Sequence, residues 1–199
     1  MCRFIETIRV ENGVPCLLPL HEERMNRTRR LCMGSTDRLS LADVWKNDVS
    51  KDVLMKWRVV YDEKNIVESL CTPYHPRKVR TLKLVTDNEI DYAYKSEDRS
   101  ALNQCFELRG DADDVLVVRN GKITDTSIAN VALFDGRQWW TPKYPLLRGV
   151  KRQFLLENGL VKERDIFMDN LSDYSCIRLF NAMLDWDEME LPIEAIKNV

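Results

Sequence analysis

Apolar and polar residues alternate in short runs through the first third of the chain, a pattern that predicts β-strands. Residues 4–10 and 14–18 form two such runs on either side of Asn12-Gly13, and Asn-Gly between apolar runs is typical of a β-hairpin. A polar four-residue turn separates two further runs, residues 53–61 and 66–72, and predicts a second hairpin. The chain is therefore expected to begin with strands that pair through tight turns.

Two helices are expected between these hairpins. Residues 21–33 interleave charged side chains with apolar ones, and Gly34 is placed as the helix stop. Ser40 precedes a short apolar and acidic run, so we expect it to cap a second helix that runs to Val49, with Asp43 at the capping-box position. The first part of the chain should thus combine two hairpins with two helices.

The pattern changes after the second hairpin. Pro73 and Pro76 cannot both lie inside a regular element, so we place a domain boundary between a small N-terminal α+β domain, residues 1–75, and a larger C-terminal β-rich domain with helices, residues 76–199. Strands and helices recur beyond the boundary without strict β-α-β alternation, which favours the α+β class over a doubly wound sheet. The elements predicted there are strands at residues 81–86, 115–119, 130–134 and 138–141, and helices at residues 97–108 and 147–157.

Composition limits the function classes. The 199 residues carry 30 Lys and Arg against 32 Asp and Glu, a formal net charge of −2, so a basic nucleic-acid-binding surface is disfavoured. No apolar run is long enough to cross a bilayer, and the amino terminus lacks a secretory pattern. We therefore expect a cytoplasmic protein that binds neither a membrane nor nucleic acid.

Metal and disulfide chemistry are not indicated. The six cysteines are scattered without a C-x-x-C pair, and the two histidines, His21 and His75, are far apart in sequence. A chain of this length can build its own core without disulfides, so we expect reduced and mostly buried thiols. No metal-binding residue is assigned.

Four short segments carry the chemical information. In chain order they are ETIRV followed by HEER (6–24), a lysine within AYKSEDRS (93–100), DTSIAN (125–130) and LLRGVKR (146–152). Their order resembles that of the class IV aminotransferase family, the pyridoxal-phosphate enzymes of fold type IV, across about residues 4–185. The resemblance implies a two-domain fold type IV enzyme that uses pyridoxal 5'-phosphate (PLP), acts on a small molecule and forms a homodimer.

Lys95 is the expected catalytic residue. The family places its Schiff-base lysine just before a helix and ahead of an acidic-x-x-x-x-Asn motif, and Lys95 precedes Asp125 and Asn130 in that way. A lysine suits this role because its pKa shifts readily in a desolvated pocket, its amine attacks an aldehyde, and it can then act as a base. Composition alone would leave Lys95 as a solvated surface lysine.

The resemblance assigns Asp125 to the pyridine nitrogen of the cofactor. A carboxylate there keeps the nitrogen protonated, so that the ring can accept electrons. The family usually carries glutamate at this position, and aspartate is one methylene shorter. The alternative is an aspartate that caps its own turn. Asn130, at the end of the motif, is expected to support the loop around the cofactor.

The cofactor phosphate is assigned to two places. Arg24 matches the arginine of the family's H-x-x-R step, and a guanidinium offers two parallel donors to phosphate oxygens. The alternative is an arginine on the exposed face of a charged helix. The backbone amides of Val150 and Lys151 follow Gly149 at a helix start, where phosphates bind readily. Lysine replaces the family's customary threonine at residue 151.

Three residues are weaker candidates for substrate binding. Arg58 aligns loosely with a basic residue that faces the site in the family, but a strand residue can face either way. Arg99, four residues after Lys95, could contact phosphate or substrate, or point to solvent. Asn181 opens an N-A-M segment similar to that of the lyase branch, where a structural role is the alternative.

The resemblance leaves three functions open. We favour a lyase that converts 4-amino-4-deoxychorismate to 4-aminobenzoate and pyruvate for folate synthesis, because aromatisation of the product helps to drive the elimination. Family members usually carry a further strand ahead of the segment that matches residues 4–8, and its substrate-carboxylate groups have no counterpart here. This weakens the second function, an amino-acid aminotransferase of the branched-chain or D-amino-acid type. The third is a degenerate homologue that binds the cofactor without turnover.

Overall fold

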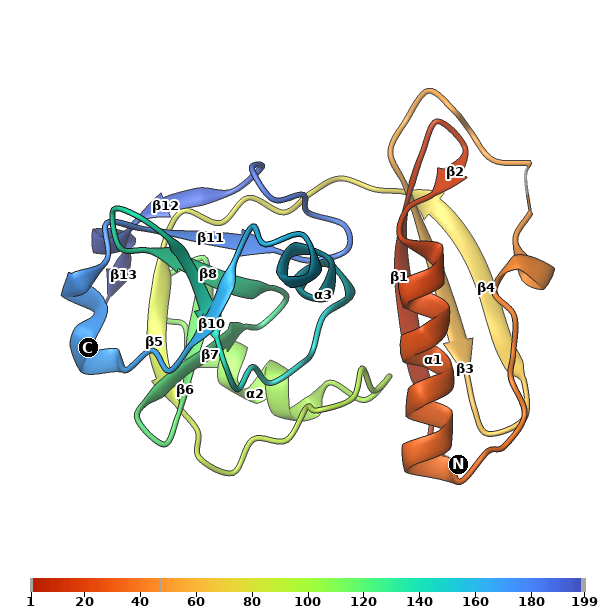
Figure 1. The fold of residues 1–199 in the computed structure, drawn as a ribbon, viewed down its shortest axis with the longest axis horizontal. Coiled ribbons are helices and arrows are strands. Elements are labelled where there is room, and N and C mark those ends of the chain that lie inside the picture. The colour runs from red at the N-terminus through yellow and green to blue at the C-terminus, as the bar shows by residue number, and fades with distance from the viewer. Residues whose placement is uncertain (1, 47, 198–199) are drawn as a thin grey trace. The chain divides into compact units, whose positions relative to one another are not determined.

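The computed structural model describes residues 2–46 and 48–197, shown as a ribbon in Figure 1. Among these, residues 2–76 and 94–98 form one compact unit, and residues 77–93 and 99–197 form a second. The segment 94–98, expected in the larger domain, belongs to the first unit instead. The reason is backbone pairing with the first strand: the Ile5 N–H donates to the Lys95 carbonyl at 2.9 Å, and the Glu97 N–H donates to the Arg3 carbonyl at 3.0 Å.

The first unit is an antiparallel sheet with one long helix against it (Figure 1). The sheet has the strand order β2-β1-β3-β4. Both predicted hairpins form, and Asn12 and Gly13 take the left-handed backbone that the first turn needs, with φ of 52° and 78°. The elements are β1 (Phe4–Glu11), β2 (Val14–Pro15), α1 (Leu18–Met33), β3 (Met55–Tyr61) and β4 (Ile66–Pro73).

The second apolar run forms a shorter strand than expected. The prediction of a strand over residues 14–18 is wrong beyond Pro15, because Leu17 turns into the left-handed region at φ 53° and α1 begins at the next residue. Pro19 fits the first turn of the helix, where its missing N–H leaves no hydrogen bond unmade. Gly34 ends α1 with φ 73°, as predicted.

The helix expected from Ser40 to Val49 does not form in the described residues. Only one 3₁₀ turn is present, η1 (Ala42–Val44). The buried Leu41 donates its N–H to Oε2 of Glu22, on α1, at 2.9 Å. Glu22 of the neighbouring helix thus holds Leu41 in place, and only this single turn follows it in the residues that the structure describes.

The second unit holds two mixed sheets. Their strand orders are β13-β5-β6-β7 and β10-β9-β8-β11-β12. The β13–β5, β5–β6 and β9–β10 pairs are parallel, and the other pairs are antiparallel. The strands are β5 (Leu82–Thr86), β6 (Asp114–Arg119), β7 (Lys122–Thr126), β8 (Asn130–Phe134), β9 (Trp139–Pro142), β10 (Lys162–Arg164), β11 (Cys176–Phe180), β12 (Glu190–Pro192) and β13 (Ile196–Lys197).

Side chains that alternate in direction along the strands give each sheet of this unit an apolar inner face. Apolar residues on one face of each sheet meet in a shared core, with Leu116 of β6, Val131 of β8 and Ile177 of β11 fully buried. The opposite faces are covered by helices: α2 (Ser100–Glu107) packs against Val115 and Val117, and α3 (Val150–Glu157) packs near Phe180. The predicted α+β class is confirmed.

Both helices of the second unit start three residues later than predicted. Glu97 takes part in the backbone pairing described above, and the Leu147 N–H is accepted by Asp125 of β7; each helix begins three residues after its contact. The prediction of mostly buried thiols is also wrong. None of the six cysteines, all of which lie in the described residues, forms a disulfide, and Cys105 alone among them is buried. None of the helices in the described residues is long and apolar enough to span a membrane.

Candidate functional site

The first unit contains a buried ionic cluster of Glu6, His21 and Arg24, which we call the Glu6 cluster. Alternation along β1 turns Glu6 towards α1, where its side chain is completely buried. Arg24 donates hydrogen bonds to both oxygens of the carboxylate, from Nε to Oε1 at 2.9 Å and from Nη2 to Oε2 at 2.5 Å. His21 Nδ1 lies 2.6 Å from Oε2. The predicted phosphate residue Arg24 is therefore fixed in a bidentate ion pair.

The charges of the Glu6 cluster are balanced. Burial alone would raise the pKa of the Glu6 carboxyl, but Arg24 and His21 outweigh it and lower the pKa to about 2. The pKa of His21 is lowered, chiefly by burial and in smaller part by the positive charges of Arg24 and Lys95. At neutral pH the imidazole is therefore neutral and donates its Nδ1–H to the ionised Glu6.

Lys95 lies beside the Glu6 cluster. Its charge contributes to the lowered pKa of His21, and its carbonyl is held by the Ile5 N–H at the edge of β1. The Lys95 residue as a whole is half-buried. Two of the predicted residues, Lys95 and Arg24, are thus brought together in the first unit by one strand and one helix.

Arg58, a predicted substrate residue, is engaged by two carboxylates. Its Nη1 donates to Glu68 at 2.5 Å and its Nη2 donates to Glu97 at 2.7 Å. All three side chains remain partly exposed to solvent. A substrate carboxylate would therefore have to compete with Glu68 and Glu97 for this guanidinium.

The second unit holds a buried carboxylate at Asp125, on β7. Its Oδ1 accepts a hydrogen bond from Asn130 Nδ2 at 2.9 Å, and its Oδ2 accepts one from the Leu147 N–H at 2.8 Å. Asn130 Nδ2 also donates to the Leu147 carbonyl at 2.8 Å. Burial raises the pKa of the Asp125 carboxyl to about 6, although these hydrogen bonds oppose the rise. Asp125 is therefore a group that can hold or release a proton close to neutral pH.

The start of α3 presents free backbone donors. Gly149 is its N-cap and provides no capping side chain. Among the described residues, the N–H groups of Val150 and Lys151 have no hydrogen-bond partner. The Lys151 ammonium pairs with Asp185 at 2.5 Å, so the lysine that replaces the customary threonine adds little free charge. These two N–H groups form the predicted anion-binding start of the helix.

Arg99 and Asn181 brace the turn between β7 and β8. Arg99 Nη2 donates to the Ser127 carbonyl at 2.7 Å, and Asn181 Nδ2 donates to the Ile128 carbonyl at 3.0 Å. The Asn181 Oδ1 also accepts the Met183 N–H at 2.8 Å. Both predicted substrate residues thus support the loop that joins Asp125 to Asn130.

Sequence reasoning missed Glu6 and His21 as parts of the site. A usable signal was present, because Glu6 falls on the same face of the alternating strand as Phe4, Ile8 and Val10. A carboxylate on an apolar face requires a buried partner, which pointed to a cation on the covering helix. The role of Leu147 carried no such signal, since only its backbone is used.

Comparison with known proteins places these residues in context. The family described as amino-transferase class IV matches residues 98–188. An uncharacterised protein of Haemophilus influenzae is 32% identical over 188 residues, which cover 92% of this chain and 98% of that protein. The crystal structure of a Haemophilus somnus protein, provisionally named a 4-amino-4-deoxychorismate lyase, is 32% identical, with a TM-score of 0.84 over 94% of this chain and 98% of that one. A hypothetical aminotransferase of Mycobacterium tuberculosis in its PLP-bound form is 20% identical, with a TM-score of 0.73 over 92% of this chain and 78% of that one.

Proposed function

Because the chain belongs to the class IV aminotransferase family, we propose that it is a PLP-dependent lyase that converts 4-amino-4-deoxychorismate to 4-aminobenzoate and pyruvate. The observation that carries the proposal is the similarity to the Haemophilus somnus protein, which extends over nearly the full length of both chains. The enzyme would act as a cytoplasmic homodimer and supply 4-aminobenzoate to folate synthesis.

The residues fit PLP by the chemistry of their donors and acceptors. The unpartnered N–H groups of Val150 and Lys151 suit a phosphate. The two oxygens of Asp125 accept hydrogen bonds from Asn130 and from the Leu147 N–H, and an ionised carboxylate has about four acceptor positions, so it can also pair with a pyridine nitrogen. The Lys95 amine suits the aldehyde. Each functional group of the cofactor thus has a candidate partner in the chain.

The catalytic role we assign to Lys95 is proton transfer. When bound, PLP supplies an aldehyde that condenses with amines and a ring that accepts electrons from the adjacent carbon. The Lys95 Nζ would hold the aldehyde carbon until the substrate amine replaces it. The freed Nζ would then take the proton from the substrate ring carbon. The enolpyruvyl group would leave with the electron pair of its C–O bond and regain the proton as pyruvate, and the ring would become aromatic, which favours the products.

The roles of Asp125 and Arg24 are electrostatic. Asp125 would keep the ring nitrogen protonated, and its pKa of about 6 leaves a carboxylate in excess at neutral pH. Arg24 would contact the phosphate while Glu6, itself hydrogen-bonded to His21, holds the guanidinium in place. Asn130 would keep Asp125 in position through the hydrogen bond to its Oδ1.

The proposal is tested by supplying purified enzyme with 4-amino-4-deoxychorismate generated in situ. We expect equal amounts of pyruvate and 4-aminobenzoate, without any requirement for a keto-acid acceptor. In parallel, D- and L-amino acids are supplied with 2-oxoglutarate. Lys95→Ala protein is the control for both mixtures. Fast amino transfer that depends on the acceptor, with no 4-aminobenzoate formed, would assign the chain to the aminotransferases instead.

A further inference from the structure

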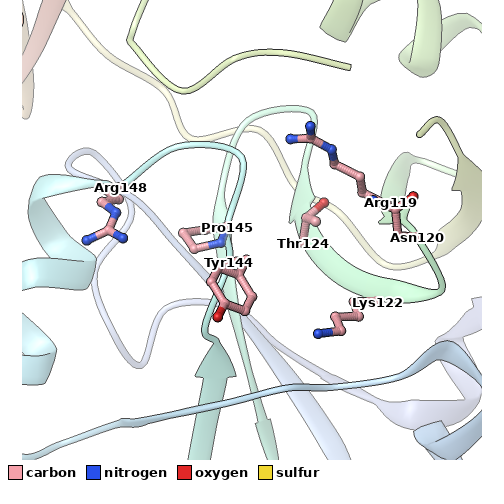
Figure 2. A pocket seen from close by; sticks show the side chains of 7 residues that line it. All are labelled: Arg119, Asn120, Lys122, Thr124, Tyr144, Pro145 and Arg148. Carbon is pink, nitrogen blue, oxygen red and sulfur yellow. The ribbon is translucent and has the colours of Figure 1, made fainter. Parts of the chain in front are cut away.

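A basic cavity lies within the second unit, at the β6–β7 hairpin and the loop after β9 (Figure 2). Its volume is about 380 Å³, which is within the range of small-molecule sites. Three of the residues that line it are cations, Arg119, Lys122 and Arg148. No carboxylate is among the lining residues that the structure describes. An electropositive space of this kind favours an anionic ligand.

Two of the three cations have no partner among the residues that the structure describes. The third cation, Lys122, forms an ion pair with Asp165 at 3.1 Å, and Asp165 is not one of the residues that line the cavity. Within residues 2–46 and 48–197, the side chains of Arg119 and Arg148 make no hydrogen bond and no ion pair, and both residues are exposed. About two positive charges are therefore left uncompensated at this cavity.

A second cavity of about 370 Å³ provides an internal comparison. Lys83, Arg109 and Lys197 line it, but Asp111 lines it as well. Arg109 is occupied: it donates to the Phe106 carbonyl at 3.1 Å, and its guanidinium lies 4.0 Å from the centre of the Phe106 ring. The lining of this second cavity thus includes a carboxylate, whereas the first has none among the described residues that line it.

The remaining walls define the ligand further. Asn120 and Tyr144 add an amide and a hydroxyl to the donors, and the Tyr144 ring and Pro145 offer apolar surface (Figure 2). A phosphate monoester carries about 1.5 to 2 negative charges at neutral pH and several acceptor oxygens, whereas a single carboxylate carries one charge. We propose that this cavity binds a small phosphate monoester, with the positive charges of Arg119 and Arg148, which flank the cavity in Figure 2, attracting the phosphate and Tyr144 against the organic group.

The proposal is tested by calorimetric titration of the holoenzyme, whose cofactor site is already filled. Phenyl phosphate is the probe, and we expect one saturable site per chain. Arg119→Gln and Arg148→Gln should each weaken binding about tenfold or more, since each removes a charge-assisted pair. Asp165→Asn should tighten binding several-fold because it releases Lys122. None of these readouts depends on turnover, so failure of the proposed lyase reaction would leave the proposal intact.

Matched controls separate the site from general charge effects. Arg137→Gln removes an exposed arginine on the β8–β9 turn, and Asp187→Asn removes an exposed aspartate after β11; neither should change the affinity. Inorganic phosphate should bind at the same site and compete with phenyl phosphate. The proposal is overturned if the Arg119 and Arg148 variants bind like the Arg137 variant, or if succinate and benzoate bind as tightly as phenyl phosphate.

Discussion

Gly149 lies so close to Asn130 that a Cβ built on the glycine would come within 2.1 Å of the asparagine Oδ1. No such contact is tolerated, so a larger residue at this N-cap must displace Asn130. Asn130 holds Asp125 and the Leu147 carbonyl with one amide group. The glycine is therefore needed for its small size and not for a left-handed backbone, since its φ is −69°.

Gly149→Ala should destabilise the protein by about 1 to 3 kcal/mol, because the extra methyl group overpacks a buried hydrogen-bond network. The free energy of unfolding is measured in urea. Gln153→Ala, in the second turn of the same helix, is the control and should change stability by less than about 0.5 kcal/mol. Equal stability of the two variants would show that Asn130 moves aside at no cost.

Lys95 should be the residue that carries the cofactor covalently. After borohydride reduction of the PLP-loaded protein, peptide mass spectrometry should find the added cofactor mass on the peptide containing Lys95 and on no other. Lys95→Arg protein should carry no adduct. An adduct on Lys151 or another lysine would contradict the assignment.

Arg24→Ala should weaken PLP retention by about 2 kcal/mol or more, since a buried charge-assisted contact is lost. The dissociation constant is measured by dialysis against PLP and absorbance. Arg30→Ala, at an exposed position of the same helix, is the matched control. If both variants retain PLP equally well, Arg24 serves only to pair with Glu6.

Stability should fall in acid because of Glu6. Its pKa is about 2 in the folded protein against 4.5 ordinarily, so its stabilising contribution is complete above about pH 4.5 and is lost as the pH falls towards 2. The contribution amounts to roughly 3 kcal/mol, at about 1.4 kcal/mol for each pKa unit. Urea unfolding across this range should give a steep slope for the native protein and a flatter one for Glu6→Gln. Glu23→Gln, at an exposed position of α1, should keep the native slope.

Asp125 should change stability with pH in the direction opposite to that of Glu6. Its pKa is raised to about 6 from 3.8, so folding favours the protonated carboxyl, and this contribution is present below about pH 3.8 and lost as the pH rises through 6. Cofactor-free Asp125→Asn protein should therefore lack the loss of stability that the native protein shows between about pH 4 and 6. Parallel pH profiles for the two proteins would mean that Asp125 is not desolvated in the apo state.

Features set by neighbouring residues in the chain were predictable. The turns at Asn12-Gly13 and Asn120-Gly121 both require positive φ at two successive positions, which Asn and Gly tolerate best, and both adopt it. The long helix and its stop at Gly34 follow in the same way. The helix expected after Ser40 is reduced to the single turn Ala42–Val44 in the described residues, where Leu41 is held by Glu22, a residue distant in sequence.

The candidate site was predictable in its residue types but not in its contacts. The motifs single out Lys95, Asp125 and Arg24, whose functional roles remain predictions. The bidentate grip of Arg24 on Glu6 depends on how α1 lies on β1, which no local pattern specifies. The contact between Asp125 and the Leu147 N–H likewise joins residues 22 positions apart through a backbone group.

The pairing of residues 94–98 with β1 has a consequence for the behaviour of fragments. A polypeptide that ended at Pro76 would include every named strand of the first unit, yet the first half of β1 would present an uncovered row of backbone donors and acceptors. Exposed strand edges recruit other chains, so such a fragment should aggregate. The segment that carries Lys95 thus also covers the edge of the sheet, and the first unit cannot be produced as a stable fragment from residues 1–76 alone.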